Sequence, residues 1–204
     1  MSDDLKSSSD VDVALVASWR RGDLSSFEML VRKYQKRLLN VAFRITGVYE
    51  DACEVTQDTF VAAFRGIDSF RGEARFFTWL TSIALNLSRN RLQQMQTKLH
   101  HEAYSLDEPA RGEHSTMIHE HERPCSAPSA LERLERLDLQ ERLQGCIRAL
   151  SAEFREAIVL RDLQDFSYGE MCTIIKVREG TVKSRLFRAR EMVKDCLKRA
   201  VGEL

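Results

Sequence analysis

The stretch Ser167-Tyr-Gly-Glu-Met-Cys-Thr-Ile-Ile-Lys-Val-Arg-Glu-Gly-Thr-Val-Lys-Ser-Arg-Leu-Phe-Arg-Ala-Arg190 decides the fold of the C-terminal part of this 204-residue chain. Ser167 and Glu170 have the spacing of a capping box, which predicts a short helix through Ile174. A turn over 176–180 follows, and the last helix then has apolar residues at helical spacing, at Val182, Leu186 and Ala189. A short capped helix, a tight turn and a basic helix together predict a helix-turn-helix.

The last helix of this motif carries a basic face. Six basic residues lie within 176–190 against Glu179 alone, and Lys183, Ser184, Phe187 and Arg188 share the side opposite the apolar stripe. Arginine and lysine donate to guanine edges, and phenylalanine meets a thymine methyl group. A charge run is more often a solvated face, but a one-signed run with an exposed aromatic side chain favours contact with DNA.

The remaining sequence predicts two helical units joined by a linker. All five histidines and all three prolines lie between His100 and Pro128, which marks a boundary. We therefore expect an all-α protein with domains at 1–98 and 129–204 and a flexible linker over 99–128. In the first unit, apolar spacing predicts helices around 14–19, 27–42, 52–64 and 76–87. In the second, Ser129 with Glu132 and then Ser151 are candidate helix caps.

The net charge of the whole chain is zero, which by itself argues against a nucleic-acid binder. The sum is zero because an acidic segment offsets the positive charge of the other two. Residues 1–98 carry 14 basic and 12 acidic side chains, 99–135 carry 3 and 8, and 136–204 carry 14 and 11. The acidic middle segment masks two mildly basic units.

Several classes of protein are disfavoured by composition. No apolar run approaches the ~20 residues of a membrane span, and the acidic, serine-rich start lacks the pattern of a secretory signal, so we expect no membrane insertion and a cytoplasmic location. Five widely spaced cysteines, without a CxxC pair, predict buried thiols rather than a disulfide framework or a zinc ribbon. No Walker loop, nucleophile elbow or HExxH motif is present, so we expect no enzyme and no cofactor.

Two surfaces of the first unit are candidates for binding. Trp79, Ser82, Asn86, Arg89 and Asn90 share a helix face beside the loop 68–73, and aromatic rings with amides suit an unstacked single strand. From periodicity alone, Trp79 is as consistent with core packing. Asp51, Glu54 and Asp58 form an acidic stripe beside Gln57, which is either solvated or a docking surface for a basic partner.

These motifs, in this order, resemble bacterial extracytoplasmic-function (ECF) sigma factors. The resemblance is carried by Asp51–Phe60, Phe70–Glu73, Phe76–Leu80, Ile83–Asn86 and Gly180–Arg190. It implies a two-domain helical protein that binds core RNA polymerase, directs it to promoter DNA and is held inactive by an anti-sigma partner.

The resemblance also implies roles for individual residues. The polymerase-docking set is Asp51, Glu54, Gln57 and Asp58. The minus-10 set is Phe70, Arg71, Gly72, Glu73, Trp79, Asn86, Arg89 and Asn90. The minus-35 set is Arg178, Thr181, Lys183, Ser184, Arg185, Phe187 and Arg188. Thr81 and Ser82 depart from the family pattern, in which an aromatic residue and arginine are common. Lys176 replaces the usual turn glycine, which places a non-glycine residue at positive φ.

Two alternatives follow from the residues. The chain could be a stand-alone helix-turn-helix regulator, which would bind duplex DNA tightly without polymerase. His119, His121 and Cys125 in the linker could ligate a transition metal. A flexible linker seldom preorganises such a site, so we expect no metal.

Overall fold

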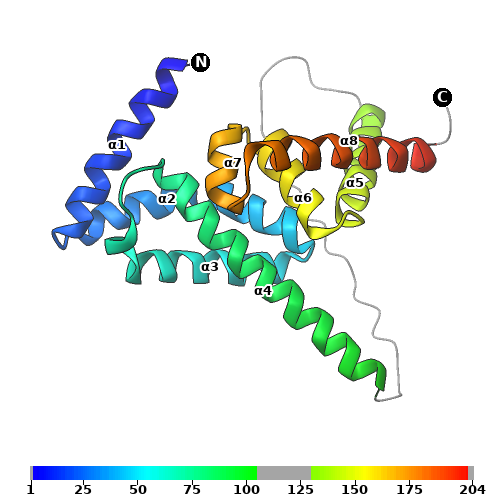
Figure 1. Ribbon diagram of the computed structural model, residues 1–204, viewed down its shortest axis with the longest axis horizontal. Coiled ribbons are helices and arrows are strands. Elements are labelled where there is room, and N and C mark those ends of the chain that lie inside the picture. The colour runs from blue at the N-terminus through cyan, green and yellow to red at the C-terminus, as the bar shows by residue number, and fades with distance from the viewer. Residues whose placement is uncertain (1, 105–129, 202–204) are drawn as a thin grey trace.

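The computed structural model describes residues 2–104 and 130–201, and within these ranges it contains helices and no strand. The N-terminal unit consists of α1 (Ser2–Arg20), α2 (Leu24–Thr46), α3 (Tyr49–Arg65), the short 3-10 helix η1 (Ile67–Ser69) and α4 (Phe76–Tyr104). The C-terminal unit consists of α5 (Ala130–Arg148), α6 (Ala152–Ile158), the π-helical turn η2 (Val159–Leu163), α7 (Tyr168–Ile175) and α8 (Glu179–Val201). The all-α prediction is confirmed (Figure 1).

Local sequence explains the bounds of α2. Asp23 caps its N-terminus by accepting a hydrogen bond from the Ser25 backbone N–H at 3.0 Å. Gly47 ends it at a φ of 79°, in the left-handed region that favours glycine. The apolar stripe between these caps is buried as predicted, and it packs α2 against α3 and α4. Its fully buried members include Leu30, Leu38 and Val41.

Two helices extend further than the sequence pattern predicts. α1 begins at Ser2, whereas apolar spacing predicted only a short helix around 14–19. α4 runs to Tyr104, so it enters the segment assigned to the linker, and its end projects beyond the neighbouring helices (Figure 1). Both extensions are polar, and a helix without an apolar stripe leaves no periodic signal. The rest of the linker, with His119, His121 and Cys125, lies outside the described residues.

The helix starts of the C-terminal unit follow the sequence in part. Ser167 and Glu170 form the predicted capping box of α7. Ser151 takes the N-cap position of α6, but its side chain makes no capping hydrogen bond, so that part of the prediction is wrong. Ser129, the first residue of the predicted Ser129–Glu132 box, lies outside the described residues.

The two units share one continuous hydrophobic core. Buried residues from Val16 to Leu85 in the N-terminal unit belong to the same cluster as those from Ile147 to Ala189. Phe77 of α4 and Phe166, before α7, stack with ring centroids 5.6 Å apart and planes 5° from parallel. Phe166 is among the largest fully buried side chains, so this contact is the apolar centre of the interface between the units.

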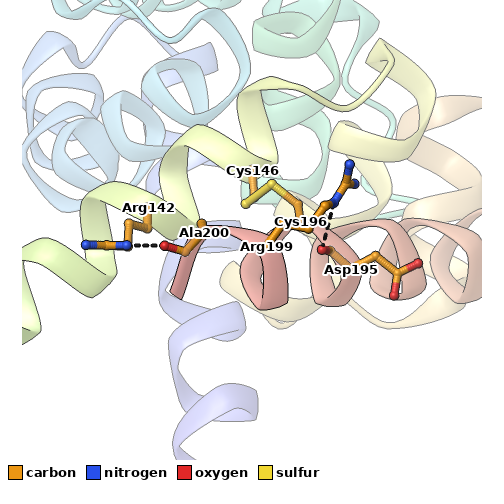
Figure 2. Close-up of a disulfide and its surroundings, with 6 residues drawn as sticks. All are labelled: Arg142, Cys146, Asp195, Cys196, Arg199 and Ala200. Atoms are coloured by element: carbon orange, nitrogen blue, oxygen red, sulfur yellow. Dashed lines mark hydrogen bonds between the residues drawn. A yellow bond between two sulfur atoms is a disulfide. The ribbon is translucent and has the colours of Figure 1, made fainter. Parts of the chain in front are cut away.

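One cysteine prediction is wrong. Cys146 of α5 and Cys196 of α8 form a disulfide, with their Cα atoms 5.7 Å apart (Figure 2). Fifty positions separate them in the chain, and only the packing of α5 against α8 brings them together. Cys53 and Cys172 are free thiols, as predicted, but both are half-buried rather than buried.

Among the described residues, no helix is long and apolar enough to cross a membrane. The same part of the chain holds no cluster of three or more metal-ligating side chains.

Candidate nucleic-acid interface

The helix-turn-helix is built by three local features. The Ser167 hydroxyl accepts from the Glu170 N–H at 3.3 Å, and the Glu170 carboxylate accepts from the Ser167 N–H at 3.0 Å. Lys176 ends α7 at a φ of 56°, which confirms the prediction of a non-glycine residue in the left-handed region. Val182 and Leu186 then anchor α8 in the core. These features fix the orientation of α8.

The outer face of α8 carries most of the predicted minus-35 residues. Phe187 is 68% exposed, a large apolar area for a ring with no core contact. Lys183 pairs with Glu179 at 2.6 Å and lies 5.5 Å from the centre of the Tyr168 ring. The bond to Glu179 raises the pKa of Lys183, so it is a cation at neutral pH. The other exposed members are Arg178, Thr181, Ser184 and Arg188.

Arg185 lies on a different side of α8. Its guanidinium pairs with Glu153 of α6 at 2.7 Å, and its side chain is 23% exposed. Arg190 similarly donates two hydrogen bonds to Asp162, at 2.9 and 2.6 Å. Both arginines therefore fasten α8 to its own domain in this structure.

At the tip of the loop between η1 and α4, Arg71, Gly72 and Glu73 are exposed. Gly72 has a φ of 75°, which turns the chain outward at a position where a side chain would be strained. Phe70, by contrast, is only 7% exposed, and its ring packs 5.2 Å from that of Trp79. Phe70 thus holds the base of the loop.

Trp79 packs in the core and is also accessible for contact with a DNA strand, so both alternatives that periodicity left open apply to it. It is half-buried, with its ring 5.7 Å from Phe76 and packed against the core, while the rest of its surface remains accessible beside the loop. Thr81 is fully buried and donates to the Phe77 carbonyl, so it is part of the helix packing. Ser82 donates to the Trp79 carbonyl at 2.7 Å.

Arg89 is held by the other domain. It donates two hydrogen bonds of 2.6 Å to the carboxylate of Glu156, which is only 3% exposed. The hydrogen bond to Glu156 raises the pKa of Arg89 despite partial burial. Asn86 and Asn90, on the same face of α4, are exposed. The predicted minus-10 face is therefore partly covered by α6.

A second ion pair joins the domains at Glu170. Its carboxylate accepts from Arg75 at 2.6 Å and from Thr78 at 2.8 Å, in addition to its role in the capping box. Burial opposes ionisation, but the hydrogen bonds from Arg75, Ser167 and Thr78 outweigh it and lower the pKa of Glu170 to about 2. Arg37 of α2 reinforces this contact by donating to the Gln164 carbonyl at 2.6 Å.

The acidic stripe of α3 divides into two parts. Asp51 is buried and accepts from Arg91 of α4 at 2.6 Å, while the exposed Glu54 pairs with the same guanidinium at 2.9 Å. The bond to Asp51 raises the pKa of Arg91. Gln57 and Asp58 are exposed. Val61, about one turn further along α3, is 47% exposed and adds an apolar side chain to this face.

The sequence patterns missed two residues that define this arrangement, Arg91 and Glu156, and the second role of Glu170. Arg91 organises the acidic stripe, and Glu156 and Glu170 hold the domains together. Glu156 comes directly before the apolar run Ala157–Leu160, beside Arg155 and Glu153, and nothing in this local pattern indicated its burial. Its partner Arg89, 67 positions away, was expected at the minus-10 face, and the sequence did not indicate its contact with Glu156.

Comparison with protein families identifies both units. Residues 30–97 match sigma-70 region 2, and residues 140–193 match sigma-70 region 4. The chain belongs to the sigma-70 family. Sigma factors act in transcription initiation, and the ECF resemblance inferred from the motifs is confirmed by the relatives.

Curated relatives match over nearly the whole length. The RNA polymerase sigma-H factor of Pseudomonas aeruginosa is 30% identical over 192 residues, which cover 94% of this chain and 96% of that protein. The ECF RNA polymerase sigma-E factor of Haemophilus influenzae is 33% identical over 184 residues, covering 90% and 94%. This chain is thus an ECF sigma factor.

Two solved structures share its fold. CnrH in complex with the cytosolic domain of CnrY is 26% identical with a TM-score of 0.63, over 93% of this chain and 99% of that one. The sigma factor RpoE of Bartonella quintana, in complex with the anti-sigma factor NepR, is 25% identical with a TM-score of 0.59, over 84% and 96%.

Proposed function

We propose that this ECF sigma factor binds core RNA polymerase through α3 and reads promoter DNA with α8 and with the loop 70–73 beside α4. The observation that carries the proposal is the outer face of α8. A helix whose buried side is fixed in a helix-turn-helix presents Phe187, Lys183 and Arg188 to solvent. This arrangement suits insertion into the major groove of a minus-35 element.

Recognition by α8 combines charge and shape. Arg178, Lys183 and Arg188 displace counterions from the phosphates or donate to guanine edges, so binding weakens steeply as salt is raised. Phe187 can pack on a thymine methyl group, which buries its exposed ring. Arg185 contributes mainly by holding α8 against α6 through Glu153.

At the minus-10 element, the protein acts without covalent chemistry. Opening the duplex costs a few kcal/mol per unstacked base, and a site that receives a flipped base offsets part of this cost. We assign this site to Arg71, Gly72 and Glu73, supported from below by Phe70 and flanked by Trp79. Asn86, Arg89 and Asn90 extend it along α4.

On the polymerase-docking face, the exposed residues Glu54, Gln57 and Asp58 make contact. Asp51 is a positioning residue because its buried carboxylate fixes Arg91. The apolar area at Val61 adds contact surface beside the charges.

The packed arrangement of the two domains is the inactive form. Arg89 cannot meet DNA while Glu156 holds it, so the domains must separate before the minus-10 face is complete. Both solved relatives are complexes with a second protein, and NepR is an anti-sigma factor. We propose that an anti-sigma factor of this chain stabilises the same packed form. The protein would work in the cytoplasm, with the polymerase, as a non-enzymatic subunit.

The test is transcription in vitro from a promoter library with bacterial core polymerase. Start sites that need both the polymerase and this protein would support the proposal. Tight, specific duplex binding without polymerase, and no start sites, would favour a stand-alone regulator instead.

A further inference from the structure

Cys146 and Cys196 are the two cysteines that the structure brings into bonding contact. Cys146 is 3% exposed, on the inner side of α5, and Cys196 is half-buried on α8 (Figure 2). Neither residue belongs to the faces assigned above to DNA or polymerase. Their role is therefore separate from promoter recognition.

The two halves of α8 are anchored differently. Up to Arg190, the helix is held by Val182, Leu186 and the ion pairs of Arg185 and Arg190. Beyond Arg190, every described side chain is exposed or half-buried. The disulfide, partial packing of Val193, and a hydrogen bond from Arg142 to the Ala200 carbonyl fasten this half to the rest of the domain.

We infer that Cys146 and Cys196 form a reversible thiol–disulfide site, with hydrogen peroxide as its oxidant. The inference rests on the proposed function in one respect: the protein works beside a cytoplasmic polymerase. In that compartment thiols are kept reduced, and disulfides that do form are usually transient and responsive. This pair lies on the domain proposed to bind promoter DNA, so formation of the bond would change that domain when the compartment becomes oxidising.

The reaction balances with peroxide alone. The Cys196 thiolate, the more accessible of the two, attacks one peroxide oxygen, the O–O bond breaks, and the released hydroxide takes a proton to form water. The Cys146 thiolate then attacks the sulfenic sulfur of Cys196, the S–O bond breaks, and a second water leaves. Two thiols lose two electrons and two protons in total, and a cellular dithiol reverses the reaction by exchange.

Two arginines lie near the cysteines along the chain. Arg142 lies one turn before Cys146, and Arg199 lies nearly one turn after Cys196, on the same stretch of the domain (Figure 2). Oxidation then fixes the C-terminal half of α8, while the DNA-facing half keeps its own anchors.

The experiment compares the full chain reduced by dithiothreitol with the same protein after brief hydrogen peroxide treatment. The readouts are mass, the thermal midpoint and amide hydrogen exchange. We expect a Cys146–Cys196 peptide in the oxidised protein and a thermal midpoint lower by roughly 10 °C on reduction. Exchange over 192–201 should rise about tenfold on reduction, with less than about threefold change over 179–190.

Variants separate this site from the other thiols. Cys146→Ser and Cys196→Ser should each abolish the disulfide and the shift in thermal midpoint, whereas Cys172→Ser, at a half-buried free thiol on α7, should form the bond like the parent protein. The inference is overturned if peroxide modifies Cys53 or Cys172 without forming the bond. It is equally overturned if a glutathione buffer of cytoplasmic potential fails to reduce the bond. The same holds if the thermal midpoint and the hydrogen exchange are equal in the oxidised and the reduced protein. None of these readouts needs polymerase, so they stand apart from a failure of the proposed function.

Discussion

The contact between Glu156 and Arg89 gives the sharpest prediction, because it joins the two domains through a predicted DNA contact. Replacing Glu156 with glutamine keeps the shape of the side chain and removes its charge. The guanidinium of Arg89 then keeps at most a hydrogen bond to a neutral amide in place of its paired bonds to a carboxylate. The packed form should therefore weaken, while the surfaces proposed for polymerase and DNA remain intact.

The size of the effect follows from the exposure of the pair. A hydrogen bond to a charged partner contributes about 1.5–3 kcal/mol and a neutral one about 0.5–1.5 kcal/mol. Glu156 is almost completely buried, but the Arg89 side chain is 37% exposed, so solvent recovers part of the loss. We expect the packed form to lose about 1 kcal/mol, which corresponds to roughly a fivefold change in an equilibrium constant.

The assay is the affinity of the protein, in the presence of core polymerase, for a labelled minus-10 strand, measured by fluorescence anisotropy, because the packed form covers the proposed minus-10 face. Because the apparent dissociation constant is the intrinsic one divided by the fraction of open molecules, Glu156→Gln should bind roughly fivefold more tightly. Glu141→Gln, an exposed acid on α5, is the matched control and should bind like the parent. Unchanged or weaker binding by Glu156→Gln would refute the claim that this contact holds an inactive form.

Three further predictions concern the other elements. Arg188→Ala should weaken polymerase-dependent binding of the cognate minus-35 duplex about tenfold and that of a scrambled duplex less, in a filter or anisotropy assay. Lys176→Gly should raise the free energy of unfolding by about 0.5 kcal/mol, since glycine relieves the left-handed conformation but loses more entropy on folding; urea denaturation measures this. The pKa of Glu170 is lowered to about 2, so its stabilisation of the domain contact is complete above about pH 4.5 and is lost as the pH falls from there toward 2. Glu170→Gln, which keeps a capping side chain, should remove that pH dependence from the thermal midpoint.

Local chemistry made much of the C-terminal domain predictable. The Ser167–Glu170 capping box, the left-handed Lys176 and the buried stripe of α8 all depend on residues within a few positions of one another. Their consequences could be derived from spacing alone. The exposed face of α8 followed from the same periodicity.

What the sequence did not reveal depends on contacts between distant residues. The second role of Glu170 comes from Arg75, 95 positions away, and the disulfide joins residues 50 positions apart. Hydrophobic spacing also could not predict that Phe70 is buried, because Phe70 lies in a loop, where no helical periodicity separates buried from exposed positions. The burial of Asp51 had the same origin, since its partner Arg91 lies on another helix.

Polymerase-dependent melting of promoter DNA tests the central claim most directly. With core polymerase, this protein and a duplex containing a selected promoter, permanganate should detect unpaired thymines at the minus-10 element. Reactivity should be absent when either protein is omitted, and it should fall strongly with Trp79→Ala. Melting that occurs without this protein, or no melting on any promoter of the library, would contradict the account.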